Sequence, residues 1–151
     1  MIAALILAIL LAYVEARNDA QDIIDHKPID HLVGWVTRAA FMVFAVGGLY
    51  GMGAITSGWQ VVAALIASAC IFSACFRWRL NKWRGVRAVY ISPSSWYDWQ
   101  FLRLFLPFDR TEAVEAWHIY MDSRDARKAG MVAYMTEGMM VLSCFAFYRW
   151  V

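Results

Sequence analysis

The chain has 151 residues, of which 62% are hydrophobic and 17% are charged. Soluble domains carry about 25% charged residues and about half apolar ones, so this composition excludes an ordinary water-soluble globule. The net charge of +2 gives no reason to expect a nucleic-acid partner, and the length suits one domain over residues 1–151.

The first apolar run extends from Met1 to Val14. No basic residue precedes it and no small-residue cleavage site follows it, so we interpret it as a retained membrane segment of about residues 1–16. Because no glycine or proline occurs before Pro28, we expect this helix to continue past Glu15, as a polar extension, to about Asp25. The run is short for a span of about 20 residues, and a helix lying on the membrane surface is the alternative.

The next two apolar runs predict membrane helices over about residues 31–55 and 59–77. Arg38 is the only formally charged residue of the first, and the uncharged turn between the runs is too short for anything except an antiparallel hairpin. The second run is rich in alanine and serine. Small residues let helices approach closely in lipid, so we predict that residues 59–77 lie at the centre of the bundle.

A polar region follows over residues 77–128. Its aromatic segment Trp96–Leu106 begins with a capping pattern, Ser95 and Asp98, and its composition predicts a helix in the membrane interface. A helix packed in a soluble core is the alternative.

Residues Thr111–Lys128 predict a cytoplasmic amphipathic helix, which continues into a last span over about residues 130–149. Together these elements predict an all-α fold: an integral membrane four-helix bundle with an interfacial helix and a cytoplasmic amphipathic helix.

The distribution of charge predicts the orientation. Ten of the 14 basic residues lie in residues 77–128, so the positive-inside rule places this loop in the cytoplasm and both termini outside, with the bacterial inner membrane as the expected location. Residues 15–30 carry five acids and two bases, a net charge of −3, whereas Arg77–Arg87 carries five bases and no acid. We expect either that these two segments dock on one another or that the basic segment binds anionic lipid headgroups. The residues expected to bind lipid or a partner are Arg77, Arg79, Lys82, Arg84, Arg87, Trp96 and Trp99.

Arg38 and Glu137 are charged residues inside predicted spans, seven positions beyond His31 and Gly130 respectively. Counted from the same face of the membrane, both lie about 10 Å deep. A lone charge at such a position costs at least about 2.5 kcal/mol, so we predict an intramembrane ion pair that locks the bundle, or contacts from both residues to one polar group. A proton or ion relay and snorkelling to the interface are the alternatives.

Several carboxylates and imidazoles could carry chemistry on the cytoplasmic side. Glu115 and His118 form one Glu-x-x-His pair, whereas a di-iron bundle needs two such pairs and two further glutamates. Solvated surface residues explain these groups as well as a metal site does, so no cofactor is expected. The metal alternative would use Asp22, His26, Glu115 and His118. The candidates for a catalytic site are Glu15, Asp19, His26, His31, Arg84 and His118.

Two polar stretches carry a resemblance to a known group. They are Glu15-Ala16-x-x-Asp19-Ala20 and Arg77-x-x-x-Asn81-x-x-Arg84-Gly85, the latter followed by Tyr90-Ile91-Ser92-x-Ser94-Ser95-x-Tyr97-Asp98. Both resemble segments of an uncharacterised group of small multipass membrane proteins of bacteria and their phages. The group has no function to transfer. The resemblance implies one polar cluster on the cytoplasmic face, formed by Glu15, Asp19, Asn81, Arg84 and Asp98.

These features favour a non-enzymatic membrane protein, acting as an accessory, assembly or structural subunit of a membrane complex or homo-oligomer. Membrane lipids and other protein chains are the expected partners. The alternative is a lipid- or headgroup-processing enzyme with a polar or metal-containing site on the cytoplasmic face.

Overall fold

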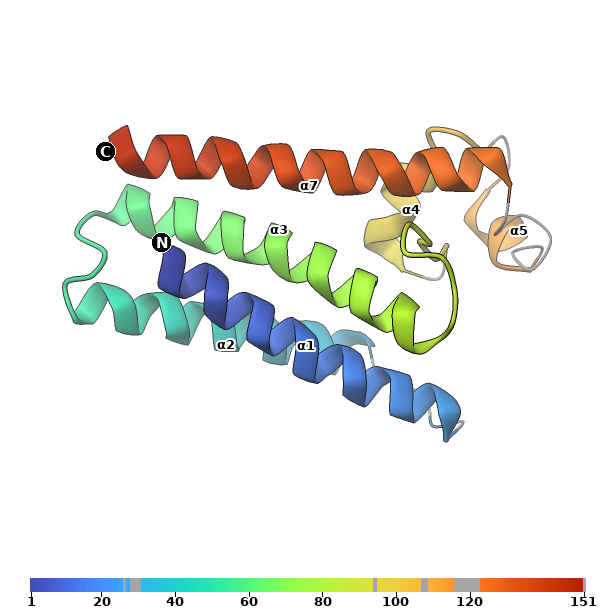
Figure 1. Cartoon of the computed structure of the whole chain (residues 1–151), viewed down its shortest axis with the longest axis horizontal. Coiled ribbons are helices and arrows are strands. Elements are labelled where there is room, and N and C mark those ends of the chain that lie inside the picture. The colour runs from blue at the N-terminus through green and yellow to red at the C-terminus, as the bar shows by residue number, and fades with distance from the viewer. Residues whose placement is uncertain (26, 28–30, 94, 107–108, 116–122, 151) are drawn as a thin grey trace.

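Helices are the only regular secondary structure in the part of the chain that the computed structural model describes, residues 1–25, 27, 31–93, 95–106, 109–115 and 123–150. Figure 1 shows the helices α1 (Ile2–Ile24), α2 (His31–Gly51), α3 (Gly58–Trp83), α4 (Trp96–Leu102), α5 (Arg110–Glu115) and α7 (Arg124–Trp150). The prediction of an all-α chain is therefore confirmed for these residues.

Three helical segments in the described residues are long and apolar enough to cross a membrane: Val33–Gly51, Gly58–Trp83 and Arg124–Trp150. They are compatible with a multi-pass membrane protein. α1 has 23 residues but is not one of these segments, because Glu15, Arg17 and Asp19 interrupt its apolar character.

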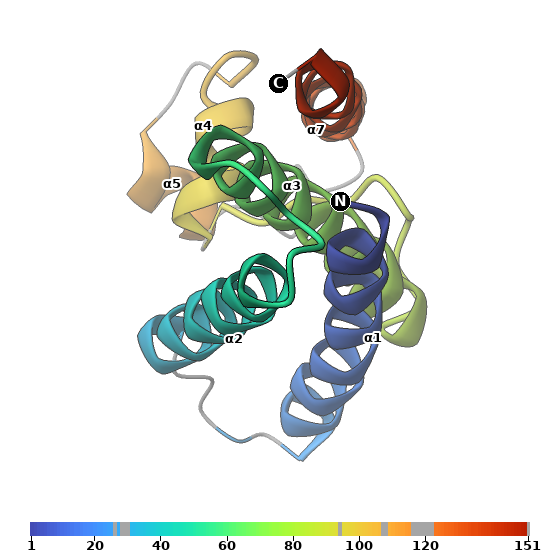
Figure 2. The ribbon, with the colours of Figure 1, turned by 90° about the vertical axis from the view of Figure 1, so that its left-hand side faces the viewer.

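α3 is the central helix of the bundle, as its small residues predicted. Figure 2 shows the bundle end-on, with α3 between α1, α2 and α7. α1 turns a stripe with four-residue spacing toward it, and the buried residues of this stripe are Ala4, Ala8, Ala12, Ala16 and Ala20. The matching buried face of α3 contains Ala63, Ala64, Ala67 and Ser68. Side chains this small let the two backbones approach closely, which sets the rotation of α1 about its own axis.

α7 runs without a break from Arg124 to Trp150. The Ser123 hydroxyl accepts a hydrogen bond from the Ala126 N–H at 3.1 Å and caps its first turn. The predicted continuation of residues 124–128 into the last span is therefore confirmed, but the predicted helix over 111–128 is not continuous, because it is interrupted at Ser123. The first half is present as α5, and residues 116–122 lie outside the described part of the chain.

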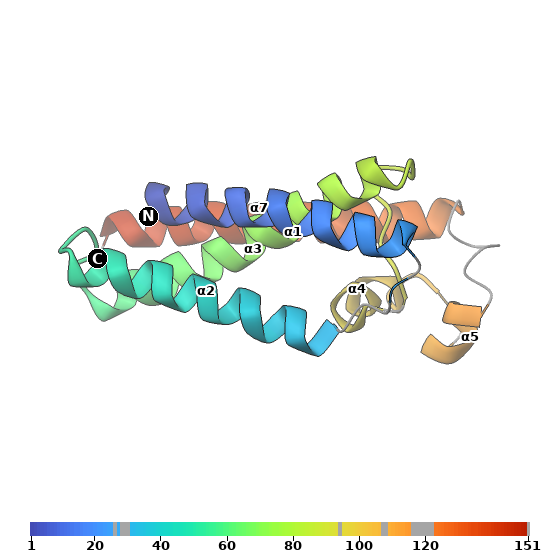
Figure 3. The same cartoon turned by 90° about the horizontal axis from the view of Figure 1, so that it is seen from below.

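α4 is shorter than the predicted helix over 96–106 and packs against α7. The Ser95 hydroxyl accepts from the Asp98 N–H at 3.3 Å, so the predicted cap is present. Leu102 and Ile91 join a buried cluster with Ala126 and Ala129 of α7. Figure 3 shows α4 and α5 at one end of the bundle, the end at which α3 terminates.

The segment between α3 and α4 is held down on the bundle by two close contacts. Gly85 has a φ of 66° and ends α3 in the left-handed conformation that favours glycine, which reverses the direction of the chain. The segment then crosses α7 so closely that a Cβ on Gly130 would overlap the carbonyl oxygen of Val89. The Asn81 side chain donates to the carbonyl oxygens of Ala88 at 3.1 Å and Tyr90 at 2.7 Å. These contacts bring residues 86–98 over the ends of α3 and α7.

Candidate functional site

The first of two charged clusters joins α1 to α2. Arg38 of α2 donates from Nε to Glu15 Oε2 at 3.1 Å and from Nη2 to Asp19 Oδ2 at 3.0 Å. Glu15 and Asp19 lie four residues apart, so they share one face of α1 and reach the same guanidinium. The guanidinium carbon also lies 4.6 Å from the centre of the Phe76 ring of α3. One arginine thus connects three helices.

The second cluster is centred on Arg77 of α3. Its guanidinium holds both carboxylate oxygens of Glu137 on α7, at 3.0 and 3.3 Å, and lies 3.2 Å from Asp98 Oδ1 on α4. The exposed fractions are 2% for Glu137, 6% for Arg77 and 8% for Asp98, so all three groups are buried. Burial of ionised groups requires nearly complete pairing, and the bidentate contact supplies it.

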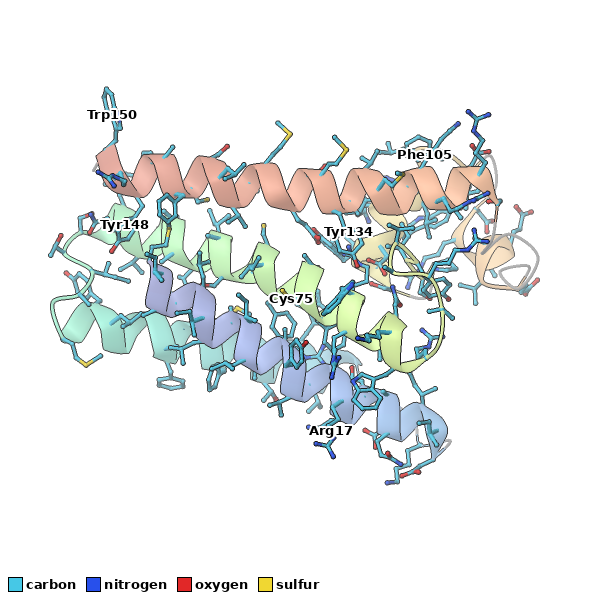
Figure 4. All side chains as sticks on the ribbon, in the orientation of Figure 1. Arg17, Cys75, Phe105, Tyr134, Tyr148 and Trp150 are labelled. Atoms are coloured by element: carbon cyan, nitrogen blue, oxygen red, sulfur yellow. The ribbon has the colours of Figure 1, made fainter. Side chains whose placement is uncertain are left out.

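Hydroxyl groups complete the second cluster. Ser73, one turn before Arg77 on α3, accepts from Arg77 Nη2 at 3.2 Å. The Tyr97 hydroxyl donates to Glu137 Oε1 at 3.0 Å. Tyr134 points from α7 toward α4, as Figure 4 shows, and its hydroxyl donates to the Ala88 carbonyl at 2.9 Å. The Tyr134 ring centre lies 5.0 Å from the Arg77 guanidinium carbon, within range of a cation–π contact.

Burial raises the pKa values of two groups on α4. It raises the pKa of the Asp98 carboxyl above its ordinary range, although the neighbouring Arg77 charge opposes that shift. Burial and the Glu137 carboxylate raise the pKa of the Tyr97 phenol, which therefore stays protonated and able to donate. In the first cluster burial likewise raises the pKa of Asp19, against the charge of Arg38.

The predicted ion pair between Arg38 and Glu137 is wrong. Arg38 pairs with Glu15 and Asp19, and Glu137 pairs with Arg77. Arg38 and Glu137 lie toward the same end of the bundle, but a similar depth does not by itself bring two side chains into contact. The rotation of α2 directs Arg38 toward α1, and the rotation of α7 directs Glu137 toward α3.

Arg77 is the residue that the sequence interpretation placed wrongly. It was expected at the surface, as the first residue of a basic lipid-binding segment, yet it is buried in the bundle. A signal for this was present in the four-residue spacing of Ser73, Arg77 and Asn81, which forms a polar stripe along one face of α3.

A cavity of about 490 Å³ lies between the two clusters. We call it the charged cavity. Its polar lining includes Asp19, Arg38, Arg77, Arg84 and Asp98. Its apolar lining includes Trp35 and Met42 of α2 and Phe72 and Phe76 of α3. Four residues of the polar cluster implied by the resemblance therefore line one space, namely Asp19, Asn81, Arg84 and Asp98. Glu15 is connected to it through Arg38.

The other candidate catalytic and metal-binding residues are not brought to this cavity within the described residues. His26 and His118 lie outside the described part of the chain, as does the side chain of His31. Asp22 is exposed to solvent beside Lys27, at 3.9 Å. Glu115 is exposed on α5. Among the residues that the structure describes, no group of three His, Cys, Asp or Glu side chains is arranged to hold a metal ion.

Three further basic residues of the proposed lipid-binding segment, Arg79, Lys82 and Arg84, lie against aromatic rings. Arg79 is sandwiched between Tyr13 of α1, at 4.4 Å from guanidinium carbon to ring centre, and Trp83, at 5.0 Å. Lys82 Nζ lies 5.7 Å from the centre of a Trp78 ring. Two acids of residues 15–30, Glu15 and Asp19, pair with Arg38 of α2 instead of the basic segment, and the α1 residue that contacts Arg79 is Tyr13.

Trp96 and Trp99, the aromatic members of the same predicted set, differ from one another. Trp96 is 67% exposed at the start of α4. Trp99 packs against the buried cluster beneath that helix. Only Trp96 is therefore presented on the surface, where an aromatic ring can reach lipid.

Comparisons with known protein families, with characterised proteins and with solved structures give no match. The resemblance to membrane proteins of bacteria and their phages thus stays an expectation from sequence motifs, and the function has to be inferred from the geometry of the two clusters, the charged cavity and the surfaces of the helices.

Proposed function

We propose that the chain is a non-catalytic multi-pass membrane protein, an accessory, assembly or structural subunit of a membrane complex or homo-oligomer. The two charged clusters support this function. Their arginines are engaged by carboxylates of the same chain, and the contacts tie α1 to α2 and α3 to α4 and α7. Arginines and carboxylates that pair with one another in this way stabilise one arrangement of the helices.

The surface of α1 supports a fourth membrane helix beside the three apolar ones. Opposite its buried alanine stripe, α1 exposes a second stripe with four-residue spacing, made of Ile2, Ile6, Leu10 and Val14. Apolar side chains of this size on an outer face favour contact with lipid. Both termini and the turn between α2 and α3 lie at one end of the bundle in Figure 1. The basic residues lie toward the other, which we assign to the cytoplasmic side of a bacterial inner membrane.

The outer face of α2 is the observation that carries the assembly function. Gly47 and Gly51 are four residues apart, and a Cβ added to either meets no atom within 4 Å. This Gly-x-x-x-Gly pattern lets two helices approach closely in lipid. The small residues of α1 and α3 are used inside the bundle, whereas this pair on α2 faces open space. We therefore infer that α2 meets α2 of a second copy across a two-fold axis.

A glycine substitution tests the assembly function. The Gly47→Leu variant should dissociate the oligomer, because a leucine side chain on that face prevents close approach of the helices. Mass measurement in mild detergent and energy transfer between labelled copies in vesicles both report the change. We expect at least about a tenfold weaker association, corresponding to about 1.4 kcal/mol.

Gly138→Leu on α7 is the matched control. Gly138 is also exposed with open space around it, so the substitution adds the same side chain to another lipid-facing helix. It should leave association unchanged. A wild-type protein that stays monomeric in both measurements, or a Gly47→Leu variant that associates like the wild type, contradicts self-association through α2.

A lipid- or headgroup-processing enzyme is the second candidate. The charged cavity favours it, because its size lies within the range of about 300–1,000 Å³ found for ligand sites and its lining combines charged and apolar groups. Incubation of the protein in vesicles, followed by mass analysis of the extracted lipids, tests it. An enzyme should produce a modified lipid, and the Arg84→Gln variant should produce less of it. Unchanged lipid composition after prolonged incubation contradicts an enzyme.

A further inference from the structure

The lining of the charged cavity becomes more polar along α3, toward the C-terminal end of that helix. Deeper in the candidate membrane segments the lining contains Met42 of α2 and Ala69 and Phe72 of α3. The polar lining continues beyond those segments to Ser92 and Asp98. A ligand that fills the cavity has an apolar chain and a polar head, in the same order as a lipid in the surrounding bilayer.

The charges of the lining are of both signs. Each cluster contains one arginine and two carboxyl groups, Arg38 with Glu15 and Asp19 and Arg77 with Asp98 and Glu137. With every group ionised, each cluster has one negative charge in excess. Asp19 engages Arg38 through Oδ2, and its Oδ1 has no hydrogen-bond partner among the described residues. One carboxylate oxygen at the cavity is therefore available to a donor.

Arg84 supplies the opposite charge. It lines the charged cavity, and its guanidinium carbon lies 5.3 Å from the centre of the Tyr90 ring. Among the described residues it has no carboxylate partner. A guanidinium in this condition is suited to a phosphate, which it can hold with two parallel hydrogen bonds.

We propose that the charged cavity binds one phospholipid whose headgroup carries a primary amine, with its phosphate at Arg84, its ammonium group at Asp19 and one acyl chain along α2 and α3. The two available charges match the two charges of a phosphoethanolamine headgroup. An anionic lipid without an amine would satisfy Arg84 but leave the second carboxylate oxygen of Asp19 without a donor. This site requires membrane insertion of the bundle, but it does not require self-association or catalysis.

Native mass spectrometry of the protein with added lipids of equal chain length measures this preference directly. We expect phosphatidylethanolamine to bind at least about tenfold more tightly than phosphatidylglycerol, the difference expected from one additional charged hydrogen bond. Free phosphoethanolamine should not compete at the same concentration, because it lacks the acyl chain. Stronger binding of phosphatidylglycerol would overturn the assignment of the ammonium group, and equal binding of the free headgroup would show a soluble ligand instead of a lipid.

Two pairs of variants locate the lipid. Ala39→Trp places a large side chain in the cavity and should remove binding, whereas Ala40→Trp modifies the next exposed residue of α2, which is not in the lining. Arg84→Gln should weaken binding about tenfold, whereas Lys82→Gln removes one charge from the same segment outside the cavity and should not. Equal effects within either pair would overturn the location.

The Asp19→Asn variant separates a binding role from a structural one. Loss of this carboxylate should abolish the preference for phosphatidylethanolamine over phosphatidylglycerol while phosphate binding at Arg84 persists. If the substitution only loosened the bundle, the binding of both lipids would weaken to the same extent. A preference that survives the substitution would overturn the role of Asp19. The readout is lipid selectivity, so a wild-type protein that selects the amine lipid yet stays monomeric supports this site and contradicts only the assembly function.

Discussion

Arg77 of α3 and Glu137 of α7 form a bidentate ion pair in the interior of the bundle, with both nitrogen–oxygen distances at or below 3.3 Å. The pair ties the central helix to the last one at the point where α4 covers them. Because α4 contributes Asp98 to the same guanidinium, one side chain determines how three helices meet. The stability and pH dependence of the protein should depend on this contact.

Removal of Glu137 should destabilise the bundle. The Glu137→Ala variant leaves Arg77 buried with Asp98 as its only described carboxylate partner, and breaking a buried pair costs about 3–5 kcal/mol. We expect a loss of about 3 kcal/mol, since Asp98 remains. Unfolding in detergent, followed by tryptophan fluorescence, measures it. Asp125→Ala is the control on the same helix, because its pair with Lys128 is exposed and should contribute less than about 0.5 kcal/mol. Similar losses for both variants would contradict the structural role of Glu137.

Substitution of Arg38 should release the C-terminal part of α1 from α2. Hydrogen exchange of residues 15–24 should be faster in the Arg38→Ala variant, because the contacts to Glu15 and Asp19 are lost and two carboxylates then face one another. Arg17→Ala is the control, since Arg17 points away from the bundle in Figure 4 and is exposed. Unchanged exchange in the Arg38→Ala variant would show that packing on α3 alone orders this part of α1.

Stability should fall as the pH rises through the raised pKa of Asp98. The folded protein retains a proton on this buried carboxyl at pH values where the unfolded chain, with the ordinary value of 3.8, has lost it. The stabilisation that Asp98 contributes is therefore complete below pH 3.8 and is lost as the pH rises through the raised pKa of the folded protein. The charged groups that face Asp98 are Arg77 of α3 and Glu137 of α7, and the Ser92 N–H donates to it.

The Asp98→Asn variant measures this contribution. It should show a weaker decline of the melting temperature than the wild type as the pH rises above the ordinary pKa of 3.8. Some decline should remain, because burial also raises the pKa of Asp19. Asp22→Asn is the control, an exposed acid outside both clusters. An equal pH dependence in the Asp98→Asn variant and the wild type would contradict a protonated, buried Asp98.

Gly130 should not tolerate a side chain. A Cβ at this position overlaps the carbonyl oxygen of Val89, so Gly130→Ala must displace the segment that crosses α7. Overpacking of this kind costs about 1–3 kcal/mol. Gly138→Ala on the same helix meets no atom within 4 Å and should increase stability by up to about 1 kcal/mol through helix propensity. Equal effects of the two substitutions on the unfolding free energy would exclude close contact at Gly130.

The local signals in the sequence were sufficient for most elements. Ser95 caps α4 as predicted, because it acts through a hydrogen bond within a few positions. α3 extends to Trp83, past the predicted end of the span near residue 77, and Gly85 ends it. The predicted helix over 111–128 was wrong in being continuous across Ser123. Ser123 is a good cap, and the periodicity of apolar residues continued past it without revealing a new helix.

The sequence by itself determined that this chain is helical and that buried charges need partners within the bundle. It predicted four membrane segments, and three helices of the described residues are long and apolar enough to cross a membrane. Only the tertiary structure decided the partners, Arg38 with Glu15 and Asp19 and Arg77 with Glu137. Position along a helix follows from a fixed rise per residue, so depth can be counted from the sequence. The rotation of each helix about its axis depends on which small residues pack together, and that rotation selects the carboxylate that each guanidinium meets.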